Sequence, residues 1–373
     1  MMIMRPTQAI VDLAAIRHNI RLLAACSQEA NLLAVVKANA YGHGAVPVSK
    51  AALAAGAVSL AVAIPEEGAE LREAGIAVPI LVLGLISPEQ AETVVKHRLI
   101  TPVCTEEGAA ALSAEAIRQG RKAQVMVKLD TGMGRIGLAA GSLLAFIQSI
   151  QKLPGLKLMG LFTHLATADA QNKTYANKQI ADFASAVEGL KTAGIELPYI
   201  SAANSACILD LPGAHFNLVR AGIAMYGFLP SGEMLNRPAL KPAMTFKTRI
   251  VYLKEVEAGA KIGYGSTYTV PSATFIATLP VGYADGYSRQ FSNKAQVLIG
   301  GRRRPVIGRV CMDQIMVDLG PVCDAEVGDE AILFGKQGEE EITATELASI
   351  AGTIDYELLC AVSARVPRVY INE

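Results

Sequence analysis

Short apolar runs alternate with longer segments of helical periodicity between about residues 30 and 225. The runs are rich in Val, Ile and Leu, whereas the segments between them repeat apolar residues three and four positions apart, as amphipathic helices do. We expect eight strands, at 32–37, 59–64, 79–84, 99–104, 124–130, 156–165, 198–204 and 217–227, with helices between them such as 65–75, 87–98 and 177–194. This alternation favours an α/β fold, a closed (β/α)8 TIM-like barrel. An open doubly wound sheet is the alternative.

After about residue 235 the pattern changes to alternating strands and tight glycine turns, interrupted by one expected helix at 343–352. We therefore expect two domains, a barrel over 1–236 and a mainly antiparallel β domain over 237–373. The N-terminal "TQAIVDL" could close the barrel, or the first nine or so residues could pair with the β domain. The sequence leaves both possibilities open.

Polar residues follow several of the expected barrel strands. In a (β/α)8 barrel the active site is built at the carboxyl ends of the strands, so polar residues there are candidates for catalysis. They are Lys37 with Asn39 and Tyr41, Lys128 with Asp130 and Arg135, Thr163 with His164, Asn204 with Ser205, and Arg220 with Gly222 and Ile223.

Each of these residues alone has an ordinary structural explanation, but five strands bring cations, hydroxyls and amides to one rim. Burying them together costs several kcal/mol unless they pair with one another or with a ligand. Barrels frequently bind phosphate after strands seven and eight, where Ser205 and Gly222 lie. A lysine that reacts with an aldehyde needs a lowered pKa, which neighbouring cations and desolvation supply. Together these features describe a pyridoxal phosphate site.

Composition and charge limit the kinds of ligand and partner that we expect. The 373 residues are 51% hydrophobic and carry 34 Lys and Arg against 34 Asp and Glu. A net charge of zero gives no general attraction to nucleic acid or an anionic membrane, and "GGRRRP" (300–305) is expected to be a charged hairpin. The six cysteines have no metal-ligand spacing, so we expect no metal. No signal peptide or spanning segment is evident, which predicts a cytoplasmic protein.

Nine motifs resemble the landmarks of alanine racemases, in that family's order. They are "AVVKANAYGHG", "KLDTGMGRIG", "FTHLATAD", "ANSA", "VRAGIAMYG", "KIGYGSTY", "LPVGYADGY", "GRVCMDQIMVDLG" and "GTIDYE". The resemblance covers nearly the whole chain. It implies a fold-type III pyridoxal 5′-phosphate enzyme, an isomerase that interconverts L- and D-alanine to supply peptidoglycan precursor or to catabolise D-alanine.

The resemblance also implies roles for individual residues. Lys37 would carry the cofactor covalently and would share acid/base catalysis with Tyr264, which comes from the partner subunit of a homodimer with shared active sites. The other cofactor-binding residues would be Tyr41, Arg135, His164, Asn204, Ser205, Arg220, Gly222, Ile223 and Tyr356. Arg135 and the partner's Met312 would bind substrate, supported by Lys128 (which would be N-carboxylated), Cys311 and Asp313. The access corridor would be lined by Asp169, Tyr283, Arg289, Arg309 and Ile354.

Three alternatives remain open beside this prediction. A pyridoxal phosphate-dependent amino-acid decarboxylase shares the fold but would replace "KIGYGSTY". A non-catalytic carrier of the cofactor would resemble the barrel alone. A racemase of broader amino-acid specificity is the hardest to separate, because only the tyrosines around the site argue for a small side-chain pocket.

Overall fold

The chain divides into two compact units in the computed structural model, which describes residues 5–27 and 29–373. The barrel unit comprises 14–27, 29–40 and 45–241, and the β unit comprises 5–13, 41–44 and 242–373. The first four residues, which include the start of the segment examined for a signal peptide, lie outside the described residues.

Eight parallel strands form the centre of the barrel unit, and they confirm the expected fold class. They are β2 (Asn31–Val35), β3 (Ser59–Val62), β4 (Ile80–Val82), β5 (Ile100–Val103), β6 (Ala123–Lys128), β7 (Leu156–Phe162), β8 (Tyr199–Ser201) and β9 (Leu218–Ala221). Their order is β8-β7-β6-β5-β4-β3-β2-β9. The two ends of this path also meet, because the Arg220 N–H donates to the Ala203 carbonyl (3.1 Å) and Ser201 Oγ donates to the Leu218 carbonyl (2.7 Å).

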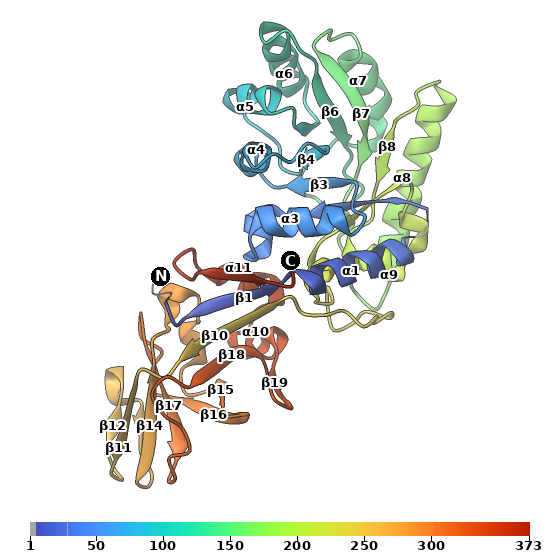
Figure 1. The fold of residues 1–373 in the computed structure, drawn as a ribbon. Helices are drawn as coiled ribbons and strands as arrows, with labels where there is room; N and C mark the ends of the chain where they lie inside the picture. Colours follow the sequence, from blue (N-terminus) through green and yellow to red (C-terminus); the bar gives the residue numbers. More distant parts are fainter. Residues whose placement is uncertain (1–4, 28) are drawn as a thin grey trace. The chain divides into compact units, whose positions relative to one another are not determined.

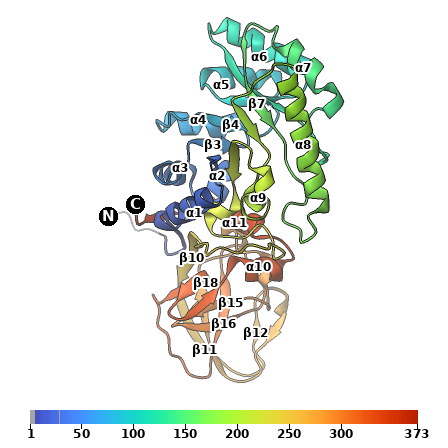
Figure 2. The ribbon, with the colours of Figure 1, turned by 90° about the vertical axis from the view of Figure 1, so that its right-hand side faces the viewer.

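Helices cover the outer side of these strands (Figures 1 and 2). Strands such as β3, β5 and β9 are buried along their whole length, which explains why they appear in the sequence as unbroken apolar runs. The helices are α1 (Leu13–Cys26), α3 (Ala45–Ala54), α4 (Pro65–Glu73), α5 (Ala91–Lys96), α6 (Glu106–Arg118), α7 (Leu143–Ile150), α8 (Thr174–Thr192) and α9 (Ser205–Asp210).

The two ends of α6 illustrate how the sequence determines where these helices begin and end. The Thr105 side chain accepts the N–H of Gly108, and Glu106 and Glu107 in the first turn and Arg118 in the last turn complement the helix dipole.

Several barrel strands are shorter than the apolar runs that predicted them. The run 32–37 ends as a strand at Val35, so placing Lys37 within that strand was wrong; the five residues of α2 (Lys37–Tyr41) follow instead. The run 217–227 ends as β9 at Ala221, because the backbone leaves the extended conformation at Gly222 and forms a 3-10 turn over Ile223–Tyr226.

Among residues 5–27 and 29–373 the β unit is built on a ten-stranded sheet, and of the strand pairs described there only β1 and β20 run parallel. Its strands are β1 (Gln8–Asp12), β10 (Met244–Arg249), β11 (Tyr252–Val256), β14 (Thr274–Leu279), β15 (Gln296–Ile299), β16 (Arg302–Ile307), β17 (Ile315–Gly320), β18 (Glu330–Gln337), β19 (Glu340–Ile342) and β20 (Arg368–Ile371). The short strands β12 (Lys261–Ile262) and β13 (Tyr268–Thr269) pair separately. The segment 8–12 lies in this sheet, with Gln8 opposite Lys247 and Ala9 opposite Arg368.

Two features of the β unit refine the sequence analysis. The expected helix at 343–352 forms α10 (Ala344–Ala351), but a second helix, α11 (Asp355–Ala361), was not predicted because seven residues give too little periodicity. The segment "GGRRRP" forms the β15–β16 hairpin, with Gly300 and Gly301 both at positive φ in the turn.

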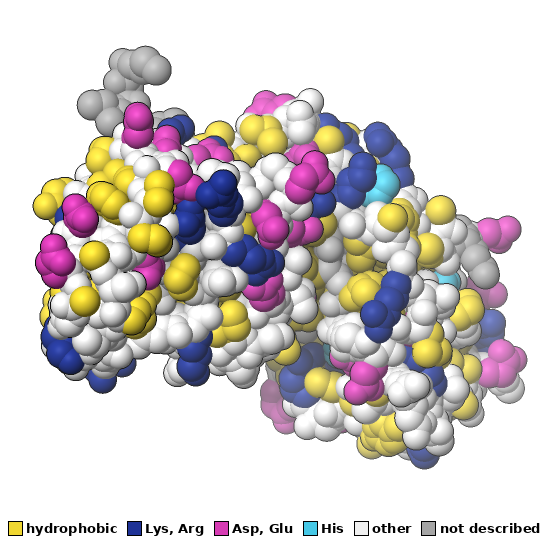
Figure 3. Space-filling view, turned by 90° about the horizontal axis from the view of Figure 1, so that it is seen from below, with side chains coloured by type: hydrophobic (Ala, Val, Ile, Leu, Met, Phe, Trp, Pro, Cys, Tyr) yellow, Lys and Arg dark blue, Asp and Glu magenta, His cyan; other side chains and the backbone are white. Residues whose placement is uncertain are grey.

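The charges of the molecule are mixed. On the face in Figure 3, Lys and Arg side chains are interspersed with Asp and Glu side chains. In the described part of the chain, every helix is too short or too polar to cross a bilayer.

Candidate active site

The carboxyl ends of the barrel strands carry the cationic and polar residues that the sequence predicted. Lys37 comes two residues after β2, Lys128 is the last residue of β6, and His164 comes two residues after β7. Ser205 begins the helix after β8, and Arg220 lies within β9. Because all eight strands are parallel, these residues belong to one end of the sheet.

Arg220 is held by several hydrogen bonds. Its side chain is buried, and its NH1 donates to Ser201 Oγ (2.7 Å). Its NH2 donates to the carbonyl oxygens of Thr163 (2.9 Å) and Ala202 (3.1 Å). Burial lowers the pKa of the guanidinium to about 10, so it remains a cation and a pure donor at neutral pH.

His164 is held as a neutral imidazole. Its Nδ1 lies 3.3 Å from the NH2 of Arg220, and since the guanidinium can only donate, Nδ1 accepts and the ring proton belongs on Nε2. Burial lowers the pKa of His164 to about 2, assisted by the positive charges of Arg220 and Lys128. His164 is therefore a hydrogen-bonding residue at neutral pH and not a proton carrier.

Lys128 is a buried amine among cations. Its Nζ lies 4.4 Å from the centroid of the Phe162 ring. Burial lowers its pKa well below the usual value, and the nearby Arg220 and Arg135 lower it further. The amine is thereby biased toward its neutral, nucleophilic form.

The glycine-rich loop after β6 is organised by Asp130. This carboxylate accepts the N–H groups of Gly132 (2.9 Å), Met133 (2.9 Å) and Gly134 (3.1 Å). Although burial alone would raise the pKa of Asp130, these backbone hydrogen bonds lower it below its usual value. Arg135, which follows directly, is exposed.

A hydroxyl and a glycine amide lie together beyond β8 and β9. The Ser205 side chain is buried, and its Oγ accepts the N–H of Gly222 (2.8 Å). Asn204 caps α9, with its Oδ1 accepting the N–H of Cys207 (3.1 Å). The glycine allows other atoms to approach its backbone closely, which suits an oxyanion.

Gln179 belongs to this region, although the sequence analysis did not select it. Its side chain is completely buried, and its Oε1 accepts the N–H of Ala166 (2.9 Å). Its Nε2 lies 3.4 Å from both Thr131 Oγ1 and the His164 carbonyl, so it links the loops after β6 and β7. A signal for it exists, because Gln179 is the polar member of the buried stripe of α8, which is made of Ala176, Gln179, Phe183, Val187 and Leu190.

Within the β unit, two of the predicted residues meet. The rings of Tyr41 and Tyr356 lie 5.9 Å apart between centroids and are tilted by 50°. Tyr41 is buried, and burial raises the pKa of its hydroxyl, which therefore stays protonated.

The segment around Met312 packs directly against the turn that carries Tyr283. The N–H of Tyr283 donates to the Cys311 carbonyl (3.1 Å), and that of Ala284 donates to the Met312 carbonyl (3.0 Å). A Cβ on Gly282 would lie only 2.3 Å from each of these two carbonyl oxygens. Only glycine fits at this position.

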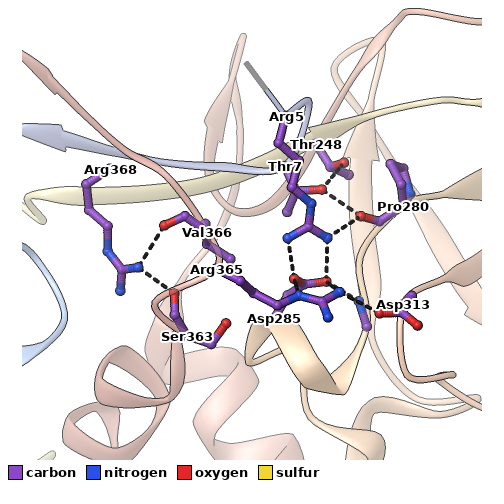
Figure 4. Close-up of polar contacts among 11 residues, drawn as sticks. Arg5, Thr7, Thr248, Pro280, Asp285, Asp313, Ser363, Arg365, Val366 and Arg368 are labelled. Carbon is purple, nitrogen blue, oxygen red and sulfur yellow. Dashed lines mark hydrogen bonds and ion pairs between the residues drawn. The ribbon is translucent and has the colours of Figure 1, made fainter. Parts of the chain in front are cut away.

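A buried carboxylate, Asp285, ties four segments of the β unit together (Figure 4). It pairs with both terminal nitrogens of Arg5 (2.5 and 2.9 Å) and with Arg365 (2.6 Å), and it accepts the N–H of Gly282 (3.0 Å). Arg365 also pairs with Asp313 (2.5 Å). Burial alone would raise the pKa of Asp285, but the two arginines lower it below its usual value. The network fixes the 282–285 turn and the residue that follows Met312.

Most of the remaining predicted residues of the β unit are exposed in the single chain, whereas Arg309 and Cys311 are half-buried. Tyr264 is 70% exposed, and Met312 and Ile354 are exposed by 52% and 61%. Gly263 and Gly265 on either side of Tyr264 have φ of 71°, and the Arg309 guanidinium lies beside Gly265. In the barrel unit, Asp169 accepts a hydrogen bond from Ser231 through its backbone carbonyl (2.6 Å).

The fold and these residues define a class: a (β/α)8-barrel enzyme with an additional β unit, whose barrel mouth combines lysines at or just beyond the strand ends with a buried arginine. The alanine racemase N-terminal domain family matches residues 11–230, and the alanine racemase C-terminal domain family matches residues 243–370. The N-terminal match precedes the C-terminal match along the chain, in agreement with the order of the motifs.

Relatives support the same assignment along the entire chain. The alanine racemase of Symbiobacterium thermophilum is 50% identical, and that of Halothermothrix orenii is 47% identical; each alignment covers at least 99% of this chain and 98% of the relative. The crystal structure of alanine racemase from Bacillus anthracis with bound L-Ala-P superposes with a TM-score of 0.94 at 40% identity, covering 99% of this chain and 96% of that one. The chain belongs to the alanine racemase family. It is therefore an isomerase, and the expected family and enzyme class are confirmed.

Proposed function

We propose that the chain is a pyridoxal 5′-phosphate-dependent alanine racemase that interconverts L- and D-alanine. The observation that carries the proposal is the barrel mouth, where Lys37 follows β2 and Arg220 lies within β9. The hydrogen-bonded pair of Ser205 and Gly222 follows β8 and β9 at the same end of the sheet. The alanine racemase family is generally dependent on this cofactor, which supports the same conclusion.

The residues present fit the cofactor. Pyridoxal phosphate presents an aldehyde, a pyridine nitrogen, a phenolic oxygen and a phosphate. Lys37 supplies an amine for the aldehyde, and Arg220 and Arg135 supply donors for the ring nitrogen and the phenolic oxygen. The Ser205 hydroxyl, whose oxygen accepts the Gly222 N–H (2.8 Å), can donate its own hydrogen to the phosphate, and the Gly222 N–H would turn from Ser205 to the phosphate when the cofactor binds. We assign Ile223, Tyr41 and Tyr356 to the phosphate as well, with Asn204 and His164 as supporting residues.

When bound, pyridoxal phosphate withdraws electrons from the substrate Cα, so that its proton becomes removable. We assign the proton transfers to the Lys37 amine and the Tyr264 hydroxyl. Inversion needs two groups, because one group alone would return the proton to the face it left. Lysine and tyrosine both have ordinary pKa values near 10, so proton transfer near neutral pH requires that the two groups be shifted or coupled.

Lys37 belongs to a positively charged barrel mouth, since it is one of the cations that lower the pKa of His164. The buried cation Arg220 disfavours a further positive charge in the barrel mouth. The neutral imidazole of His164 adds no charge, and its Nε2–H is available to orient an acceptor. The neutral form of Lys128 is also the form that reacts with CO2, so the structure is compatible with an N-carboxylated Lys128 that would pair with Arg135.

We further propose a homodimer with shared active sites, in which the partner's Tyr264 and Met312 complete each site. Their exposure in the single chain supports this proposal. Cys311 and Asp313 would hold the Met312 peptide for the substrate carboxylate, and Asp169, Tyr283, Arg289, Arg309 and Ile354 would line the access corridor. We propose that the boundary between the two domains lies near residue 236. We also propose that the protein acts in the cytoplasm, where it supplies or degrades D-alanine.

The test is racemisation by the purified chain. L-alanine should lose optical rotation in the presence of pyridoxal phosphate without release of CO2, and Lys37→Ala should abolish the reaction. A Lys152→Ala control, at an exposed lysine, should keep full activity. Release of CO2 would instead identify a decarboxylase, and an unaffected Lys37→Ala variant would refute the assigned site.

A further inference from the structure

The chain directly after Lys37 adopts a backbone conformation that L-residues rarely occupy. Ala38, Asn39, Ala40 and Tyr41 have φ of 51°, 52°, 54° and 52°, so four consecutive residues without a glycine are left-handed. Each such residue costs about 1–2 kcal/mol relative to a right-handed one. A turn of this kind persists only where surrounding contacts hold it.

Glu67, in the first turn of α4, accepts a hydrogen bond from the residue that follows Lys37. Its Oε1 accepts the N–H of Ala38 at 2.6 Å. Its Oε2 accepts the N–H of Ala63 at 2.7 Å and that of Ile64 at 3.4 Å. One carboxylate therefore joins the chain after β3 to the left-handed turn after β2.

The position of this hydrogen bond matters for Lys37. The Ala38 N–H belongs to the peptide plane that links Lys37 to Ala38, and this plane is rigid. Holding its N–H sets ψ of Lys37 and thereby the direction in which the Lys37 side chain leaves the backbone. The hydrogen bond to an ionised carboxylate is also stronger than a neutral one.

Helix capping alone does not account for this arrangement. A capping carboxylate is needed at the N–H groups of its own helix terminus, here Ile64, yet that contact is the longest of the three. The two short contacts go to Ala38 and Ala63, which lie outside α4. Neighbouring Glu66 in the same turn is exposed and accepts from Gln90 instead.

Other contacts hold the two ends of the turn. The Tyr226 hydroxyl donates to the Val35 carbonyl (2.8 Å) before the turn, and Asn39 Oδ1 accepts the N–H of Ala45 (2.8 Å) after it. We propose that Glu67 is a positioning residue that orients Lys37 for its reaction. The proposal rests on the role proposed for Lys37.

Glu67→Gln tests this role with minimal change in shape. The amide keeps one acceptor oxygen but turns an NH2 group toward a backbone N–H, so one arm of the bridge is lost. Glu66→Gln is the matched control, because it removes the same charge from the same helical turn without touching the 37–38 peptide. Both variants are compared with wild type as the full chain, with and without pyridoxal phosphate.

Three measurements separate positioning from folding. Hydrogen exchange of the peptide that contains Ala38 should be at least about 10-fold faster in Glu67→Gln, because exchange reports local opening. The kcat should fall on the order of 10- to 100-fold while the KM for alanine changes little, as expected for a displaced reacting group. Borohydride reduction followed by peptide mass analysis should show slower attachment of the cofactor to Lys37.

The outcomes are distinguishable. Faster exchange with unchanged kcat and unchanged cofactor attachment would overturn the proposal, as would unchanged exchange. If Glu66→Gln has equal effects, Glu67 acts only through its negative charge at the start of α4, and the proposal is refuted. If Glu67→Gln unfolds, Glu67→Asp, which retains the charge at a shorter reach, replaces it under the same criteria. Failure of wild type to attach the cofactor at Lys37 would refute the proposed function itself, independently of Glu67.

Discussion

At the scale of single residues, the barrel mouth concentrates ionisable groups whose protonation is set by burial. Arg220 remains charged, His164 remains neutral, and the pKa of Lys128 is lowered most strongly by desolvation. An amine kept neutral at the expense of its preferred charged form destabilises the folded chain. Keeping the Lys128 amine neutral therefore lowers the free energy of unfolding.

Lys128→Met should recover this cost. The usual pKa of the amine is 10.5, and the pKa is lowered in the folded chain, so between the two values the unfolded chain binds more protons and stability rises with pH. The variant should gain up to about 1.4 kcal/mol in the free energy of unfolding for each pH unit below 10.5, until the folded pKa is reached. Urea unfolding at pH 7 and pH 9.5 in bicarbonate-free buffer measures the gain. Lys152→Met is the control, and a gain that does not shrink toward pH 9.5 would contradict the explanation.

At the scale of elements, the sequence predicts the strands of the barrel because parallel strands buried on both faces leave unbroken apolar runs. It does not predict where β2 ends, because "KANAY" carries no glycine to mark a left-handed turn. Nor does it predict Glu67, which reaches Ala38 across 29 positions of the chain. Gln179 could have been found, because a polar residue interrupts an apolar helical stripe. The reactive residues at the strand ends can therefore be predicted from the sequence more readily than the residues that position them.

The close packing of the 282–285 turn against Met312 gives a prediction at this scale. Gly282→Ala would place a methyl group against two carbonyl oxygens of the backbone, which cannot move aside as a side chain can. We expect a loss of about 1–3 kcal/mol in the free energy of unfolding, the usual cost of overpacking. Gly232→Ala, where a Cβ meets no atom within 4 Å, should change stability by less than about 0.5 kcal/mol. Equal effects of the two substitutions in denaturant unfolding would contradict the packing argument.

At the scale of the whole molecule, the proposed chemistry is divided between two copies of the chain. Lys37 and Arg220 belong to the barrel unit, whereas Tyr264 and Met312 belong to the β unit and are exposed in the single chain. A symmetric dimer would contain two equivalent sites, each completed by the other subunit.

Subunit mixing checks this division. Lys37→Ala and Tyr264→Phe homodimers should each be nearly inactive, but a mixed dimer should contain about one intact site of its two. Activity should therefore return when the two variants are unfolded together and refolded. Mixing either variant with itself is the control. If mixed dimers form, as verified by mass, and remain inactive, the shared site is refuted.

The pairing of β1 with β10 and β20 has a consequence for how the protein is made. The ribosome delivers residues 8–12 before most of the barrel unit, but their partners at 244–249 and 368–371 are synthesised only after it. Domains generally fold as they are synthesised, so the barrel unit can fold while this strand still has its edges unpaired. The nascent chain must therefore keep β1 accessible until β10 and β20 have been synthesised. A chain whose synthesis stops before β20 would expose an unpaired strand edge, which promotes aggregation.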